Sequence, residues 1–329
     1  MARVFSGLFL LAVLLGGAWI WEQVDFAASG PVPRSGAHET VVDIPPRSGL
    51  WGIARELQAA GTIRSAALFA VGVRLRGEGA LLKAGEYAVP SRASMADITD
   101  LLISGLVIEH KITAAEGLTS QMIAGLVNAD RVLAGPPQRA PEEGTLLPET
   151  YLFTKGTPRS AILARMHDAQ ARFLARAWPS RDPDLPLRTP RDAITLASIV
   201  EKETSIPEER RHIASVFVNR LRLGMKLESD PTVIYGLSKG YPLGHDIRAS
   251  ELASVTPYNT YIISGLPPTP ICNPGRDSIS AVLNPEHTSD LYFVADGTGG
   301  HVFAATKAEH DRNVQRWRRI ENTALRLKP

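Results

Sequence analysis

The first third of the chain alternates apolar and polar residues in patterns that predict short strands and helices. The stretch TVVDI has the composition of a strand, and LWGIARELQAAG places Leu50, Ile53 and Leu57 on one face of a helix. SAALFAVGVRL is a second helical stretch, LKAGEYAVP reads as a strand, and SMADITDLLISG is a helix with Ser94 as its N-cap. Together these elements predict a small α+β unit at residues 40–106.

The middle of the chain, from residue 107 to about residue 188, combines regular and irregular stretches. LVIEHKIT is strand-like, while AGPPQRAPEEGTLLPETYLFTKG is rich in proline and glycine and is expected to be irregular. The stretch SAILARMHDAQARFLARAW carries Ile162, Leu163 and Met166 on one side. We therefore expect an amphipathic helix that packs against a core.

The clearest helix signals follow residue 188. Thr189 has the position of an N-cap, Pro190 that of the first helical residue, and Asp192 stands three residues after the cap. The predicted helix is uncharged over residues 193–200 and then continues into the acidic segment EKE, 201–203. An apolar helix that ends in two carboxylates suggests that one of them is held in an apolar environment.

A second helix is predicted after a tight corner, with Ser205 as its N-cap, and it is expected to end at Gly224. Glu201 and Glu203 lie in the last turn of the first helix, where the helix dipole raises the pKa of a carboxyl group. Burial raises it in the same direction, and a carboxyl whose pKa is raised toward neutrality is an acid catalyst. Helical periodicity does not decide which of the two glutamates is buried.

The N-terminus is strongly apolar. Residues 4–21 contain no charge over 18 positions, which is long enough to cross a bilayer core, and Trp19 and Trp21 stand at the far end. Arg3 precedes this segment, so the positive-inside rule places residues 1–3 in the cytoplasm and the bulk of the chain outside. A cleaved signal peptide is the alternative. The following residues, 22–39, read as a linker.

Composition excludes several classes of function. The chain has 329 residues, enough for two modest domains, and a net charge of +2 without a basic tail, so we expect no nucleic-acid partner. Its single cysteine, Cys272, is expected to be an inert packing residue. The histidines have no metal-ligand spacing, and no phosphate loop or serine–lysine motif is present, so neither a metal nor another cofactor is expected. The stretch GTGG, 297–300, reads as a hairpin turn.

Several long stretches resemble the YceG-like family, the endolytic murein transglycosylases of bacteria. The resemblance is carried by LASIVEKET, RRHIASVFVNRLRLGMKLESDPTVIYGL, PYNTYIISGLPPTPICNPGRDSISAVLNP, LYFVADGTGGHVFAAT and EHDRNVQRWR. A weaker match is EGTLLPETYLFTKG, in which Glu149 replaces the aspartate of the family. These stretches are long and specific, and the likeness extends from the apolar N-terminus to near the C-terminus.

The resemblance implies an α+β protein with an N-terminal transmembrane helix (4–21), a small LysM-like α+β domain (40–106) and a larger α+β catalytic domain (107–329). It implies a single-pass protein of the bacterial inner membrane whose bulk is periplasmic. The implied reaction is cleavage of nascent peptidoglycan strands between N-acetylmuramic acid and N-acetylglucosamine, which leaves 1,6-anhydro ends and terminates strand growth. Peptidoglycan synthases are implied partners.

The resemblance places the catalytic glutamate on Glu201. A lytic transglycosylase needs only one acid/base carboxyl, because the C6 hydroxyl of the sugar replaces water as the nucleophile. We accordingly expect a raised pKa at Glu201 and a solvated Glu203 without one. Sugar contacts are expected from amide, carboxylate, hydroxyl and tyrosine side chains of the family-like stretches: Asn219, Asp230, Thr232, Tyr235, Tyr258, Asn259 and Tyr261.

Two other functions stay open at this point. A peptidoglycan hydrolase (muramidase) would use Asp230 or Glu203 to position water and would produce reducing ends. A wall-binding scaffold without enzymatic activity would use only the small N-terminal unit, and it would not depend on Glu201.

Overall fold

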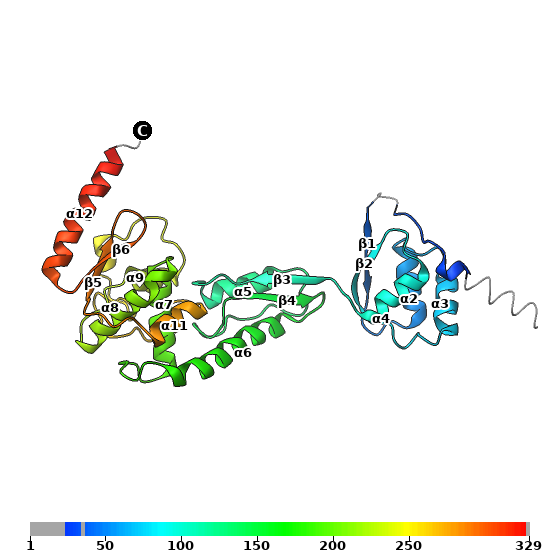
Figure 1. Ribbon diagram of the computed structural model, residues 1–329, viewed down its shortest axis with the longest axis horizontal. Helices are drawn as coiled ribbons and strands as arrows, with labels where there is room; N and C mark the ends of the chain where they lie inside the picture. Colours follow the sequence, from blue (N-terminus) through cyan, green and yellow to red (C-terminus); the bar gives the residue numbers. More distant parts are fainter. Residues whose placement is uncertain (1–23, 34–36, 327–329) are drawn as a thin grey trace, which may run out of the picture. The chain divides into compact units, whose positions relative to one another are not determined.

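The computed structural model describes residues 24–33 and 37–326, and these residues form two compact units (Figure 1). One unit contains the described residues up to His110 together with Leu152–Gly156, and the other contains the rest. The predicted transmembrane segment, residues 4–21, lies outside the described residues. Within the described ranges, no helix has both the length and the apolar character that crossing a membrane requires.

The N-terminal unit is a two-stranded sheet covered by helices. Strand β1 (Glu39–Ile44) pairs antiparallel with β2 (Gly85–Pro90), and the helices are α2 (Leu50–Ala59), α3 (Ala66–Leu75) and α4 (Met95–Ser104). A continuous apolar core includes Phe69 and Tyr87. Ser94 caps α4 as predicted, since its side chain accepts a hydrogen bond from the backbone of Asp97 and the Asp97 carboxylate accepts one in return.

The second unit is mainly helical, with small two-stranded sheets, so the α+β class is confirmed. The strands β3 (Glu109–Thr113) and β4 (Thr150–Thr154) pair with each other, and each has residues assigned to both units. The second unit contains β5 (Tyr292–Ala295), which pairs with β6 (His301–Ala304). Its helices are α5 (Ser120–Ala129), α6 (Arg159–Ala177), α7 (Pro190–Glu203), α8 (Arg210–Arg222), α9 (Asp230–Ser238), α10 (Ala249–Leu252), α11 (Arg276–Leu283) and α12 (Lys307–Arg326). Single 3₁₀ turns cover Trp178–Ser180 and Pro207–Glu209.

Helix α7 is the centre of this unit. Residues 193–200 are all buried, and the helix contacts α8, α9 and α11, which gather around it in Figure 1. The buried hydroxyl of Ser198 donates to the carbonyl of Thr195 and accepts from the backbone N–H of Ile271. Because its hydrogen-bonding capacity is used in this way, a polar residue is accommodated in an apolar helix. Cys272 lies in the same core and is buried and free, as predicted.

The local signals were correct in some places and wrong in others. Thr189 caps α7 through the predicted pattern with Asp192, and the GTGG segment joins β5 to β6. Ser205 does not cap α8. A 3₁₀ turn precedes that helix, and the hydroxyl of Thr204 accepts a hydrogen bond from the backbone of Ile206 instead. The segment expected to be irregular contains β4, whose partner β3 lies far away in the sequence.

Candidate active site

The two glutamates at the end of α7 face different surroundings. Residues two positions apart on a helix point to roughly opposite sides, because each residue adds about 100° of rotation. One carboxylate oxygen of Glu201 accepts a hydrogen bond of 2.9 Å from the backbone N–H of Gly275, directly before α11. The carboxylate of Glu203 accepts a hydrogen bond from the hydroxyl of Ser229, directly before α9. The two side chains therefore belong to separate sites.

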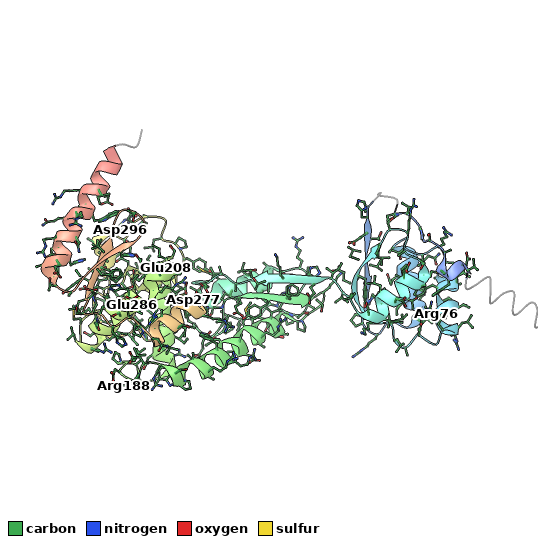
Figure 2. All side chains as sticks on the ribbon, in the orientation of Figure 1. Arg76, Arg188, Glu208, Asp277, Glu286 and Asp296 are labelled. Atoms are coloured by element: carbon green, nitrogen blue, oxygen red, sulfur yellow. The ribbon has the colours of Figure 1, made fainter. Side chains whose placement is uncertain are left out.

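Glu201 lies in a cluster of like charges. Burial raises the pKa of the neighbouring Glu116, and the charge of Glu201 adds to that effect. Arg210 is the counterion of the cluster, since its guanidinium lies 3.8 Å from Glu116 and 3.4 Å from Asp277, the latter labelled in Figure 2. The carboxyl of Glu116 occupies the space that a β-carbon on Gly275 would need. This arrangement fixes the start of α11 against α7.

Glu203 is partly buried, and the expectation that it is solvated without a raised pKa was wrong. Its pKa is raised to about 7, chiefly by burial and in smaller part by the negative charge of Asp230, against the opposing effects of the Ser229 hydroxyl, His301 and Arg220. The cause is tertiary, because the segment from Ser229 into α9 covers the end of α7. At neutral pH this carboxyl is present in both its protonated and ionised forms.

Glu203 opens onto a cavity of about 390 Å³ that is mainly polar and aromatic. Arg220, Glu228 and Asp230 line it beside the helix ends, and Tyr292 contributes an aromatic wall. The Tyr292 ring lies 5.2 Å from the Arg220 guanidinium and is stacked on the His310 ring at 5.1 Å. The remaining lining residues are Tyr261, Phe293, Lys307 and His310. Hydroxyl, charged and aromatic groups in one cavity suit a sugar ring, whose edges form hydrogen bonds and whose faces are apolar.

Two predicted sugar-contact residues, Asp230 and Tyr261, line this cavity. The hydroxyl of Tyr261 donates a hydrogen bond of 2.7 Å to the carboxylate of Asp230. Burial first, and this carboxylate second, raise the pKa of Tyr261, so the phenol stays protonated and continues to donate. Asp230 is also the first residue of α9.

The other predicted contacts lie elsewhere. Thr232 and Asn259 are fully buried, where Thr232 bonds Thr260 and Asn259 caps the backbone of Leu252 and Ser254. Asn219 donates to the backbone carbonyls of Thr288 and Asp290 and so holds that segment to α8. These three side chains therefore bond to other segments of the same unit and do not line the Glu203 cavity.

Tyr235 and Tyr258 form an aromatic pair outside the Glu203 cavity. Their rings meet edge to face at 4.8 Å. The hydroxyl of Tyr235 donates to the carboxylate of Glu143, and that of Tyr258 shares a hydrogen bond with Thr269. Tyr235 does not line the Glu203 cavity but a second cavity, which also contacts Pro231 and Ile234 of α9.

Sequence reasoning missed most of the cavity wall. Arg220 and Glu228 lie in one family-like stretch, and Tyr292, Phe293 and His310 lie in two others, but of the cavity lining only Glu203, Asp230 and Tyr261 were singled out. Those family-like stretches were the available signal. No group of three or more histidine, cysteine or acidic residues within the described chain has an arrangement that would hold a metal ion.

The fold and this cavity define an α+β protein with a carboxyl suited to acid–base chemistry. The chain belongs to the YceG-like family, whose sequence model matches residues 42–316. It is 29% identical over 362 residues to a protein of Streptococcus pneumoniae serotype 2 named endolytic murein transglycosylase, covering 95% of this chain. This chain spans only 64% of the length of that relative.

A relative from Bacillus subtilis carries the same name and is 28% identical over 339 residues, covering 93% of this chain and 91% of its own length. The crystal structure of a yceG-like protein from Listeria monocytogenes is also similar. It has a TM-score of 0.51 and 29% sequence identity, and the match covers 83% of this chain and 98% of that one. The family expected from the sequence is thus confirmed.

Proposed function

We propose that this protein is an endolytic lytic transglycosylase of peptidoglycan and that Glu203 is its acid/base group. The proposal is supported by the names of the relatives from Streptococcus pneumoniae and Bacillus subtilis. The observation that carries it is the Glu203 carboxyl, whose burial raises its pKa to about 7 beside a polar, aromatic cavity. The bond cleaved is that between N-acetylmuramic acid and N-acetylglucosamine within a strand.

Glu203 performs two proton transfers in this mechanism. Its protonated carboxyl donates to the glycosidic oxygen while the bond from that oxygen to the muramoyl C1 breaks. The resulting carboxylate then accepts the proton of the C6 hydroxyl as its oxygen forms a bond to C1. The products are a 1,6-anhydro-muramoyl end and a free hydroxyl on the neighbouring sugar, and Glu203 returns to its protonated form. A pKa of about 7 suits both steps at neutral pH.

Asp230 stabilises the positive charge that develops at C1 and the ring oxygen. Its carboxylate lines the same cavity and is held by the Tyr261 hydroxyl. A negative charge held in position beside the reacting sugar stabilises an oxocarbenium-like transition state. The raised pKa of Glu203 is partly a consequence of the same charge.

The assignment of the acid/base role to Glu201, which the family resemblance implied, stays a prediction. What favours Glu203 over it is the cavity, since Glu203 lines one and Glu201 is bonded to the backbone at the start of α11. In our proposal, Glu201 positions the segment before α11. Exchanging each glutamate for glutamine decides between the two.

Product analysis tests the proposed reaction. The full chain is incubated with peptidoglycan, and the released fragments are analysed by mass spectrometry. Fragments with anhydro ends, lighter by one water than reducing ends, are expected. Reducing ends would identify a hydrolase, and the absence of any cleavage by an otherwise folded protein would leave only a wall-binding role.

The cellular setting is proposed on sequence grounds. Residues 4–21 anchor the chain in the inner membrane with its bulk on the outer side, residues 40–106 are a LysM-like unit, and peptidoglycan synthases are partners. Strand cleavage at the membrane would terminate the growth of nascent glycans. Protease added to spheroplasts should degrade the folded units, whereas a cytoplasmic orientation would protect them.

A further inference from the structure

Helix α3 of the N-terminal unit is apolar on two sides. Its inner side, which includes Phe69, Ala70 and Val73, is buried in the core of that unit. Of its ten residues only Arg74 is charged, and it stands next to the last position. A helix that is apolar all round is normally surrounded by apolar material, whereas the outer side of α3 is exposed.

The outer side of α3 carries an apolar stripe that consists of Leu68, Val71 and Leu75. These residues are three and four positions apart, so they follow one another along the same face of the helix. Val71 is 45% exposed, Leu75 is 58% exposed and Leu68 is partly buried. Helix α4 of the same unit differs, because polar residues such as Asp97 and Asp100 occupy its exposed positions.

The chain enters the unit against α3. Phe26 is only 2% exposed, and its ring stacks on that of Phe69 at 6.3 Å. The guanidinium of Arg76, labelled in Figure 2, lies 5.3 Å from the centre of the Phe26 ring. The backbone N–H of Gly30 donates a hydrogen bond of 3.1 Å to the carbonyl of Arg92. The entering segment is therefore held to the folded unit.

The stripe begins where this segment enters. Leu68 lines a small cavity together with Asp25 and Ala28. Residues 24–27 form a helical turn, which lies beside α3 in Figure 1. The outer side of α3 is thus close to the point at which the chain arrives from residues 4–21.

The length of chain before Phe26 limits how far α3 can lie from a membrane. Residues 4–21 are the proposed anchor, and five peptide steps join Trp21 to Phe26. Five extended residues span at most about 18 Å. The headgroup region on each side of a bilayer is about 5–8 Å thick, and a helix with its side chains is about 10–12 Å wide. Helix α3, held to Phe26, then lies at or just above the headgroups.

The charge at the end of α3 suits an anionic lipid surface. Arg74 and Arg76 are exposed and flank Leu75 in the sequence. Arg76 pairs with Glu78 at 3.0 Å, so the net charge of this end is that of Arg74. An arginine beside an exposed apolar stripe can lay its stem along the apolar surface and bring its guanidinium to the phosphates of lipid headgroups.

We propose that the outer side of α3, formed by Leu68, Val71 and Leu75, lies in the headgroup region of the bilayer that residues 4–21 cross. This inference rests on the membrane anchoring proposed above and does not depend on which glutamate performs the reaction. Ten residues are too few to cross a bilayer, so α3 lies along its surface. The contact fixes the orientation of the N-terminal unit on the membrane, which the short segment 22–25 alone does not.

Spin labels on the full chain, reconstituted in vesicles of phosphatidylethanolamine and phosphatidylglycerol, test this inference. The only native cysteine, Cys272, is buried, so the label reacts with an introduced one. Val71→Cys and Leu75→Cys report on the stripe. Val41→Cys is the matched control, because Val41 is also an exposed valine of this unit, on strand β1 at the side away from α3 (Figure 1).

Electron paramagnetic resonance measures collisions of each label with oxygen, which concentrates in the bilayer, and with a nickel chelate, which stays in water. The ratio of oxygen to nickel collisions should be higher at positions 71 and 75 than at position 41. A label introduced by Ala67→Cys, an exposed residue of α3, then reports on the double variant Val71→Ser, Leu75→Ser. Losing both apolar side chains should lower the equilibrium constant of the contact about tenfold, and the ratio at position 67 should fall accordingly.

Equal ratios at positions 71, 75 and 41, in a chain that sediments with the vesicles, would overturn the inference and leave the anchor intact. Spin–spin broadening at position 71 that disappears on dilution with unlabelled protein would also overturn it, since a second copy would then cover the stripe. A chain that does not sediment with the vesicles would remove the proposed anchoring and this inference with it. Release of anhydro fragments by the same preparations tests the proposed reaction separately.

Discussion

Tyr261 and Asp230 are joined by a hydrogen bond of 2.7 Å, in which the phenol donates to the carboxylate. Both side chains line the cavity of Glu203, and the charge of Asp230 contributes to the raised pKa of Glu203. The pair therefore links the two carboxyls that the proposed mechanism uses. One must be protonated at the start of the reaction, and the other must be negative throughout.

Asp230→Asn is expected to shift the pH profile of kcat to lower pH. Glu203 must be protonated to act as an acid, so activity falls as pH rises through its pKa of about 7. Removing the negative charge of Asp230 removes an influence that raises this pKa, and the midpoint of the fall moves down. The value of kcat at low pH should also fall, because the oxocarbenium-like charge loses a partner.

Tyr261→Phe is the matched control for that shift. It removes the hydrogen bond and keeps the negative charge of Asp230, so kcat should fall while the midpoint moves much less than in Asp230→Asn. Kinetics on solubilised glycan strands over pH 5 to 9 measure both quantities. An unchanged midpoint in Asp230→Asn would contradict the electrostatic coupling.

Glu203→Gln should reduce kcat about 10²- to 10⁴-fold, because the amide has no acidic proton to donate. Glu201→Gln should reduce it much less, since its expected defect is a weakened hydrogen bond to the backbone of Gly275. Release of anhydro fragments from peptidoglycan, followed by mass spectrometry, measures both variants. A collapse of activity in Glu201→Gln with activity retained in Glu203→Gln would return the acid/base role to Glu201.

The contrast between these glutamates shows what the sequence could and could not reveal. Capping by Thr189 and the hairpin at 297–300 depend on neighbouring residues, so local patterns predicted them correctly. The pairing of β4 with β3 depends on partners distant in the sequence. The burial of Glu203 likewise depends on Ser229, 26 residues further along the chain.

Helical periodicity could not decide which of Glu201 and Glu203 is buried, and the reason is physical. It reports which side of a helix a residue occupies but not what tertiary element covers that side. Both sides of the end of α7 are covered, one by the segment before α11 and the other by the segment before α9. The chemistry of each glutamate is set by these coverings.

Gly144→Ala should destabilise the second unit by about 2–4 kcal/mol. Gly144 has φ of +77°, and an added β-carbon would lie 2.5 Å from the ring of Pro270 and 2.8 Å from Ile194 of α7. The left-handed backbone costs about 1–2 kcal/mol for alanine, and crowding against two stiff side chains adds a similar amount. Urea unfolding monitored by circular dichroism measures the change.

Gly135→Ala provides the comparison for that variant. Gly135 has φ of +83°, and nothing lies within 4 Å of the position of its added β-carbon. The unfolding free energy of Gly135→Ala should therefore fall only by the cost of the left-handed backbone, about 1–2 kcal/mol. Equal destabilisation by both substitutions would show that α7 and Pro270 accommodate the methyl group.

Glu203→Gln should make the folded protein more stable than the wild type at high pH. In the folded state the pKa of Glu203 is raised to about 7, against 4.5 for an ordinary glutamate. Between these values the native carboxyl is protonated and the unfolded one is ionised, so the unfolded state binds fewer protons and stability falls as pH rises. At 1.36 kcal/mol per pKa unit, the loss is complete above about pH 7 and reaches about 3 kcal/mol.

A glutamine side chain does not titrate, so the stability of the Glu203→Gln variant does not fall in this way as pH rises. The difference in unfolding free energy between variant and wild type should therefore grow from pH 4.5 to pH 7 and then stay constant. Denaturant unfolding at pH 4.5, 6 and 8 measures it, and Glu208→Gln, an exposed glutamate in the turn before α8, is the control (Figure 2). If the difference is the same at all three pH values, Glu203 is not held in the buried state from which its proposed role in catalysis follows.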